Sequence, residues 1–295
     1  MDRGPNDPAT GTAYDESIDP SNAAPLGFDA IRTGHGVLIA RPQHGIDLHK
    51  ADRSGFNNSG VLYDHLAQEH LALLLTRRRI SCVLDVGANQ GQYGLGLRRL
   101  GYQGHIVSFE PVASIYRILS EAARGDPKWM TFQHALGRTE SRRTIYVPHS
   151  TVFSSLLRPN QQAMELFGKR AALTRPEEVD VRRLDSVLGE LGPGVDISRV
   201  LLKIDTQGFD LEVFAGLGSS TGGIAAIQSE LSVIPLYDGM PHMLEAIAVY
   251  ESSGFAISGI YPVSVDEESL RAIEFDCMMV RTSESEAPTI NQRST

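Results

Sequence analysis

Two carboxylates, Asp85 and Glu110, lie on either side of a glycine-rich turn at residues 87–94. Glycine accepts positive φ values and lets a ligand approach the backbone where a side chain would block it. A carboxylate at the end of the strand beside such a turn lies where open α/β sheets bind their ligands, and it can accept hydrogen bonds from both hydroxyls of a ribose. These residues predict a site for a nucleoside-containing cofactor.

The acid before the turn helps to choose the cofactor. Nicotinamide and flavin sites usually have glycines at G-x-G-x-x-G, whereas this turn has them at Gly87, Gly91 and Gly94. Short-chain dehydrogenases also carry a Tyr followed four residues later by Lys, and this chain has no such pair. S-adenosyl-L-methionine suits Asp85 better, because its methionine end carries an ammonium and a sulfonium. A nucleotide-dependent (NAD/NADP) oxidoreductase and a non-catalytic cofactor-binding module are the alternatives.

The cofactor-binding residues are expected in the turn, at the strand ends and after the third strand. The loop after the third strand of a nucleotide-binding sheet lies beside the adenine, so His134 and Ala135 are candidates for contacts with the ring. The predicted cofactor-binding residues are Asp85, Gly87, Ala88, Asn89, Gly91, Tyr93, Glu110, Pro111, His134, Ala135 and Asp205.

A second charged pair, Lys203 and Asp205, belongs to the apolar run 200–205. Residues two apart face the same side of a strand, and charges in a buried strand are costly unless they are paired or functional. A structural salt bridge is the alternative to a functional role. If the methyl group of S-adenosyl-L-methionine is transferred to a hydroxyl, a base must remove the proton of that hydroxyl. Asp205 is the first candidate for this base, and Glu230 and His242 are the reserves.

A divalent metal is a second way to activate a hydroxyl. Mg²⁺ held by Asp205 with Glu230 or Asp210 would lower the pKa of the hydroxyl, and carboxylates are suitable ligands for this ion. The sequence contains no compact metal motif. A metal is therefore not favoured, and no metal ligand is predicted.

Alternating strands and helices must position these residues. Buried apolar runs predict seven core strands, at 82–86, 106–109, 130–134, 200–205, 224–230, 255–261 and 275–281. Helices are expected at 61–78, 92–100, 114–124, 161–174, 211–215 and 243–253, and Asp185 is expected to cap one more. Two further strands, 144–148 and 178–185, with a hydroxyl-rich loop at 150–157, interrupt the core and are expected to form part of the acceptor pocket. The pattern predicts an α/β, Rossmann-like fold.

The 295 residues suit one large α/β domain with appendages. We expect a polar, disordered tail at 1–25, an N-terminal cap segment at 26–60, an S-adenosylmethionine-dependent methyltransferase domain at 61–282 and a loose tail at 283–295.

Charge and hydropathy exclude several partners. The net charge of −9 argues against binding nucleic acid through its phosphates, and no Asn-Pro-Pro-Tyr-like motif for flipped bases follows the fourth strand. No apolar run is long enough to span a membrane, and the N-terminus has no signal-peptide pattern. We expect a cytoplasmic protein that acts on a small-molecule acceptor, alone or as a homo-oligomer, without nucleic acid or membrane.

The motifs together resemble the FkbM-type family of class I S-adenosylmethionine-dependent methyltransferases. The family's order and spacing are found over residues 60–282, with motifs at 85–93, 109–111, 135–137, 203–208, 228–230 and 276–280. The resemblance implies a seven-stranded, mostly parallel sheet whose last strand is antiparallel. It also implies O-methylation, usually of a sugar or a glycosylated or polyketide secondary metabolite.

One motif departs from the family pattern. The fourth-strand motif of the family usually reads Lys-Ile-Asp-Val-Glu-Gly-x-Glu, and Gln207 and Asp210 stand here where two glutamates are common. Any acid/base or metal role of those glutamates would be performed differently in this chain. The identity of the acceptor stays open.

Overall fold

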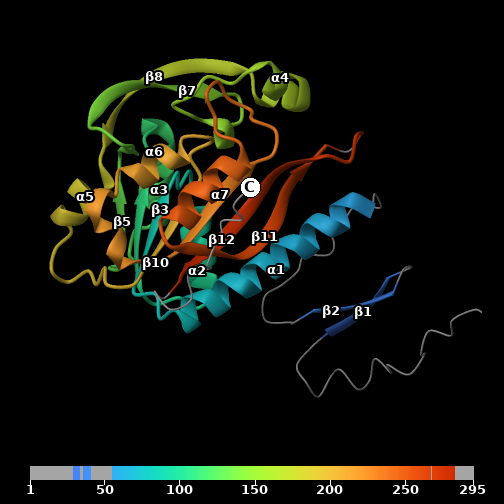
Figure 1. Ribbon diagram of the computed structural model, residues 1–295, viewed down its shortest axis with the longest axis horizontal. Coiled ribbons are helices and arrows are strands. Elements are labelled where there is room, and N and C mark those ends of the chain that lie inside the picture. Colours follow the sequence, from blue (N-terminus) through green and yellow to red (C-terminus); the bar gives the residue numbers. More distant parts are fainter. Residues whose placement is uncertain (1–28, 34–35, 41–54, 267, 283–295) are drawn as a thin grey trace, which may run out of the picture. The chain divides into compact units, whose positions relative to one another are not determined.

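The computed structural model describes residues 29–33, 36–40, 55–266 and 268–282, and Figure 1 shows how their elements follow one another. The chain divides into two units, residues 1–52 and 53–295. In the first unit, β1 (Asp29–Thr33) and β2 (Gly36–Ala40) form an antiparallel two-stranded sheet. The predictions for the tails at 1–25 and 283–295 lie outside the described residues.

A seven-stranded sheet forms the centre of the second unit, in the order β11-β12-β10-β9-β3-β4-β5. β12 is antiparallel to β10 and β11, and the remaining neighbours are parallel. This topology confirms the predicted class I methyltransferase fold. The strands are β3 (Cys82–Val86), β4 (His105–Phe109), β5 (Trp129–Phe132), β9 (Val200–Ile204), β10 (Ile224–Ser232), β11 (Phe255–Val265) and β12 (Ala272–Arg281).

The two faces of the sheet are buried by different helices. Strand β3 is buried along its whole length, with Leu84 in one apolar cluster and Val83 in another. Full burial of one such side chain contributes about 1.5–3 kcal/mol to stability. α1 (Gly55–Arg77) and α2 (Gln92–Arg99) cover the Val83 face, α5 (Leu184–Glu190), α6 (Asp210–Ala215) and α7 (Met243–Ser252) cover the Leu84 face, and α3 (Ala113–Ala122) contributes to both. No helix in the described ranges is long and apolar enough to cross a membrane.

A second, three-stranded sheet is inserted between β5 and β9. Its order is β6-β8-β7, with β6 (Ala135–Leu136) parallel and β7 (Ser141–Pro148) antiparallel to β8 (Leu173–Arg182). The 3₁₀ turn η5 (Thr151–Phe153) and helix α4 (Gln161–Phe167) lie between β7 and β8 in the chain, and Figure 1 shows β7, β8 and α4 together at one end of the domain. The sequence predicted two of these strands but not a separate sheet.

Three predicted elements differ from the structure. The helix predicted at 161–174 ends at Phe167, because Gly168 takes a positive φ of 52° and the chain from Leu173 pairs with β7. Asp185 is not the N-cap of α5. Arg183 occupies that position, while Asp185 is ion-paired to it and accepts a hydrogen bond from the Ser186 N–H.

The third difference concerns Glu230, which was expected at the end of its strand. β10 continues to Ser232, because its antiparallel pairing with β12 extends as far as the Ser232–Glu274 pair. Glu230 therefore lies inside β10, opposite Asp276.

Two glycines of α2 give a matched test of the packing. A Cβ on Gly94 would lie 2.2 Å from Cζ2 of Trp129, whereas one on Gly96 would meet nothing within 4 Å. We expect Gly94→Ala to lower the free energy of unfolding by about 1–3 kcal/mol, because the buried indole must move. Gly96→Ala should raise it by up to about 1 kcal/mol through helix propensity. Urea denaturation measures both, and equal effects would contradict this packing.

Candidate active site

The glycine turn fits tightly against the end of the neighbouring strand. Gly87 and Gly91 have φ values of +77° and +89°, as the sequence predicted. A Cβ on Gly87 would lie 1.9 Å from the backbone oxygen of Asp205. The N–H groups of Gly87 and Ala88 donate to the Phe109 carbonyl at 3.1 and 2.9 Å. Glycine at position 87 therefore allows the ends of β3, β4 and β9 to meet.

A cavity opens at this carboxyl edge of the sheet and encloses about 520 Å³, its open mouth included. Seven predicted cofactor-binding residues line it: Gly87, Asn89, Glu110, Pro111, His134, Ala135 and Asp205. The insertion contributes Leu136, Ile145, Thr151, Ser154, Ser155 and Leu156 to the lining, and the core adds Val86, Phe109, Thr206 and Phe209. The insertion thus borders the cavity.

Glu110 is buried in the wall of this cavity, with 5% of its surface exposed. Its two oxygens accept hydrogen bonds from the backbone N–H groups of Val112 at 2.8 Å and Asn89 at 3.1 Å. Burial raises the pKa of Glu110 to about 7, although these two N–H groups act in the opposite direction. Each oxygen of an ionised carboxylate has a second acceptor site, so Glu110 can still accept from a pair of ligand hydroxyls.

The polar atoms of the lining suit a ligand rich in donors and acceptors. Asn89 Oδ1, His134 Nδ1 and Ser154 Oγ are buried and have no hydrogen-bond partner among the residues that the structure describes. Unsatisfied buried polar atoms are costly, so a bound ligand that pairs with them gains affinity. Burial lowers the pKa of His134, which favours the neutral imidazole. The set fits the hydroxyls and ring nitrogens of an adenosine group.

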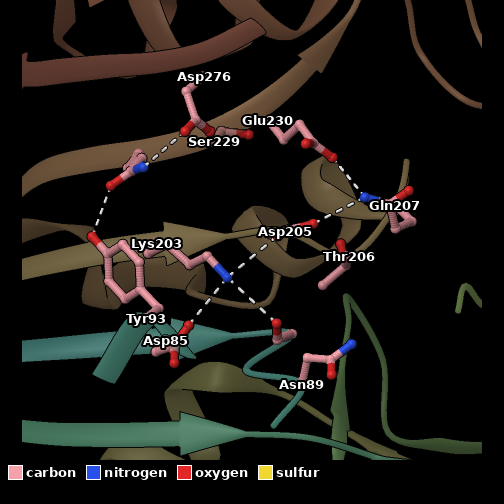
Figure 2. Close-up of polar contacts among 12 residues, drawn as sticks. Asp85, Asn89, Tyr93, Lys203, Asp205, Thr206, Gln207, Ser229, Glu230 and Asp276 are labelled. Carbon is pink, nitrogen blue, oxygen red and sulfur yellow. Dashed lines mark hydrogen bonds and ion pairs between the residues drawn. The ribbon is translucent and has the colours of Figure 1, made fainter. Parts of the chain in front are cut away.

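Lys203 joins the ends of β3 and β9 (Figure 2). Its Nζ lies 3.2 Å from Asp85 Oδ1 and 3.5 Å from Asp205 Oδ2, and it donates to the Gly87 carbonyl at 3.4 Å. Burial lowers the pKa of Lys203, but the two carboxylates outweigh it and raise the pKa above its usual value. Asp85 is fully buried and does not line the cavity. Its influence on a ligand therefore passes through Lys203 and the turn.

Gln207 links Asp205 to Glu230 (Figure 2). Its side-chain nitrogen donates to Asp205 Oδ1 at 3.0 Å and to Glu230 Oε2 at 2.6 Å. Its side-chain oxygen accepts from the Tyr237 hydroxyl at 2.9 Å. Burial, followed by the nearby Asp205 and other carboxylates, raises the pKa of Glu230 well above its usual value. Asp205 lines the cavity, whereas Glu230 lies behind Gln207.

The remaining predicted residues lie outside the cavity lining. Tyr93 donates its hydroxyl to Gln228 Oε1 at 2.7 Å, and Lys203 Nζ lies 5.3 Å from the centre of its ring. His242, a reserve candidate for the base, is the N-cap of α7 and accepts from the Leu244 N–H at 3.2 Å. Ala88 and Gly91 belong to the glycine turn and do not line the cavity.

The sequence reasoning missed two acids beside Glu230. Burial raises the pKa of Glu274 to about 7 and that of Asp276 to about 6. The signal that drew attention to Lys203, a charge within an apolar strand, is present at both positions. No group of three or more His, Cys, Asp or Glu side chains placed to hold a metal occurs in the part of the chain that the structure describes.

Comparison with known proteins identifies the family. The methyltransferase FkbM domain matches residues 85–256. The chain belongs to the FkbM methyltransferase family. The match contains the glycine turn, Glu110, Lys203 and the Asp205–Gln207–Glu230 group, and it confirms the resemblance seen in the sequence. FkbM proteins are S-adenosylmethionine-dependent methyltransferases, so the cofactor inferred from Asp85 and the turn is the cofactor of the family.

Two curated relatives of this FkbM protein illustrate the range of the match. Methyltransferase sdnD of Sordaria araneosa is 30% identical over 195 residues, which cover 58% of this chain and 75% of sdnD. The antimetabolite synthetase AmbE of Pseudomonas aeruginosa is 31% identical over 163 residues, 46% of this chain but 8% of AmbE. Among solved structures, magnesium protoporphyrin IX methyltransferase (ChlM) from Synechocystis PCC 6803 has a TM-score of 0.40 and 9% identity, covering 82% of this chain and 88% of ChlM.

The pKa of Glu110 leads to a pH-dependent prediction. A ligand diol pairs best with the ionised carboxylate, and with a pKa of about 7 this form dominates only above neutral pH. We expect the affinity for S-adenosylhomocysteine to rise by roughly tenfold from pH 6 to pH 8. Glu110→Gln should bind more weakly at pH 8 and lose this dependence. Calorimetric titration at several pH values measures both, and a pH-dependent Glu110→Gln variant would contradict the assignment.

Proposed function

We propose that this FkbM protein transfers a methyl group from S-adenosylmethionine to a hydroxyl of a small molecule, such as a sugar or a glycosylated or polyketide secondary metabolite. The observation that carries the proposal is the pair of carboxylates, Asp205 and Glu230, held by Gln207 at the edge of a cavity whose lining suits an adenosine. One relative, AmbE, is named as an antimetabolite synthetase, which supports a natural-product acceptor.

In this proposal the cavity residues hold the cofactor in separate parts. Glu110 accepts the ribose hydroxyls, while His134 and Ala135 contact the adenine. Asn89 and Pro111 complete the wall around the ribose, and the Gly87 turn lets the methionine end approach the backbone. Asp85 acts indirectly, because its carboxylate fixes Lys203. When bound, S-adenosylmethionine supplies a methyl group activated by a positively charged sulfur.

The proton of the acceptor is the chemical task left to the protein. A hydroxyl is a poor nucleophile at neutral pH, so a base within hydrogen-bond reach accelerates its attack. The side chain of Asp205 is 37% exposed and lines the cavity, so an acceptor can reach it. Asp205 therefore takes the proton, while Glu230, behind Gln207, holds the amide that donates to Asp205. The protein also holds the acceptor oxygen in line with the transferred carbon.

Binding and transfer assays test the function directly. Titration with S-adenosylhomocysteine, with NAD in parallel, separates the methyltransferase from the oxidoreductase alternative. Incubation with methyl-labelled S-adenosylmethionine and a panel of sugars, glycosides and polyketides then reports transfer by mass spectrometry. Binding of NAD instead would favour the oxidoreductase, and binding without transfer to any acceptor would favour the non-catalytic module. Binding of neither ligand would overturn the proposal.

Substitution of the proposed base should separate chemistry from binding. We expect Asp205→Asn to lower turnover by about 10²–10⁴-fold, the usual contribution of a general base, while S-adenosylhomocysteine affinity changes far less. His242→Ala is the matched comparison: loss of the helix cap costs about 1 kcal/mol of stability and should leave turnover near that of the wild type. Steady-state kinetics measures turnover, and thermal unfolding measures the stability of each variant. An equal loss of turnover in His242→Ala would contradict the role of Asp205 as the general base.

A further inference from the structure

Gln207 is held in an unusual backbone conformation with its side chain fully hydrogen-bonded. Its φ of +53° lies in the left-handed region that non-glycine residues rarely adopt. Its side-chain NH₂ group donates to one oxygen of each carboxylate, Asp205 and Glu230, and its side-chain oxygen accepts from Tyr237. Strained backbone persists where the surroundings over-determine it, and such residues gather at functional sites.

The side-chain amide of Gln207 lies between two carboxylates, where a cation would otherwise be expected. A single nitrogen lies 3.0 Å from one carboxylate oxygen and 2.6 Å from another. Two ionised carboxylates that converge in this way repel each other, and burial beside Asp205 accordingly raises the pKa of Glu230. Within the described residues Lys203 makes ion pairs with Asp85 and Asp205 and with no other acid. The amide therefore satisfies Glu230 with a neutral donor.

The insertion fixes this amide in place from the other side. Ser155 donates its hydroxyl to the Gln207 carbonyl at 2.8 Å. The Tyr237 hydroxyl lies 2.9 Å from Gln207 Oε1 and 3.0 Å from the Phe153 carbonyl, and its single proton is donated to one of these two acceptors at a time. A Cβ on the next residue, Gly208, would lie 2.8 Å from Met240, so the backbone has little room to rearrange. The amide is thus preorganised on the two carboxylates before any acceptor binds.

We propose that Gln207 is a positioning residue whose amide takes the place of a cation between Asp205 and Glu230, so that this site works without a divalent metal. The inference rests on the proposed function, since it assumes that these carboxylates serve the acceptor. It identifies Gln207 as the group that bridges the two carboxylates. It also predicts that replacing the Gln207 NH₂ with an oxygen creates a metal-binding site.

Gln207→Glu is the informative variant because it keeps the shape and replaces the bridging NH₂ with an oxygen. Three carboxylates then converge on one point, and carboxylate oxygens are the ligands preferred by Mg²⁺ and Mn²⁺. Gln207→Ala is the matched control, since it removes the bridge without adding an acid. A role limited to packing would affect both variants through stability and would give neither of them a metal site.

The experiment measures Mn²⁺ binding to the full chain by calorimetry at pH 7.5. We expect Gln207→Glu to bind Mn²⁺ at least tenfold more tightly than the wild type and Gln207→Ala. Its methyl transfer should be low in EDTA and recover when Mn²⁺ or Mg²⁺ is added, whereas wild-type transfer should be the same in EDTA and in metal. S-adenosylhomocysteine titration of each variant verifies that the cofactor site is folded.

Two results would overturn the inference. One is wild-type Mn²⁺ binding as tight as that of Gln207→Glu, with wild-type transfer abolished by EDTA. The other is a Gln207→Glu variant that binds S-adenosylhomocysteine normally but gains no affinity for Mn²⁺. Failure of the proposed function gives a different signature, because the wild type itself would then show no S-adenosylhomocysteine binding or no methyl transfer.

Discussion

The buried ammonium of Lys203 is the contact on which the arrangement of the site depends. It lies between two carboxylates from neighbouring strands, Asp85 on β3 and Asp205 after β9, and also donates to the Gly87 carbonyl. Asp85 has no exposed surface, and removing one partner of a buried ion pair typically costs about 3–5 kcal/mol. The pair therefore fixes the relative position of the glycine turn and Asp205, which border the cavity from two sides.

Two groups of polar contacts extend in opposite directions from Lys203, one toward β4 and the other toward β10. On the β4 side, Glu110 is held by the backbone of the turn, so that the shape of the turn and the position of the carboxylate are coupled. On the β10 side, Gln207 relays the position of Asp205 to Glu230. Lys203 thus lies between Glu110, which backbone N–H groups hold, and the acids Asp205 and Glu230, which Gln207 holds. The acids on the β10 side are crowded, and burial raises the pKa values of Glu230 and Glu274.

The insertion between β5 and β9 contributes to the cavity wall and also contacts Gln207. Ser154 and Ser155 line the cavity, and Ser155 also bonds the Gln207 carbonyl. The hydroxyl-rich loop that the sequence placed near the acceptor is therefore a wall of the cofactor cavity and an anchor for the bridging amide.

The α/β, Rossmann-like fold and the cofactor class could be predicted from local patterns in the sequence, whereas the antiparallel last strand was implied by the resemblance to the FkbM family. Each of these local patterns lies within one short segment and does not depend on the rest of the fold: the apolar runs of strand length, the glycine spacing and the carboxylate of Glu110 at a strand end. The family match and the sheet order confirmed these predictions. The helix predicted beyond Phe167 and the cap assigned to Asp185 were wrong, because strand pairing and an ion pair with Arg183 overrode the local preference.

The contacts between polar side chains could be seen only in the folded structure. Residue spacing could not show that Asp85 is buried away from the cavity. Nor could it show that a ring nitrogen of His242 caps a helix, or that the Tyr237 hydroxyl contacts Gln207. These contacts join residues distant in the chain, and they depend on sheet register and on the packing of the insertion. Gln207 shows the limit most clearly: the sequence marked it as a departure from a family pattern, and the fold alone placed its amide between two carboxylates.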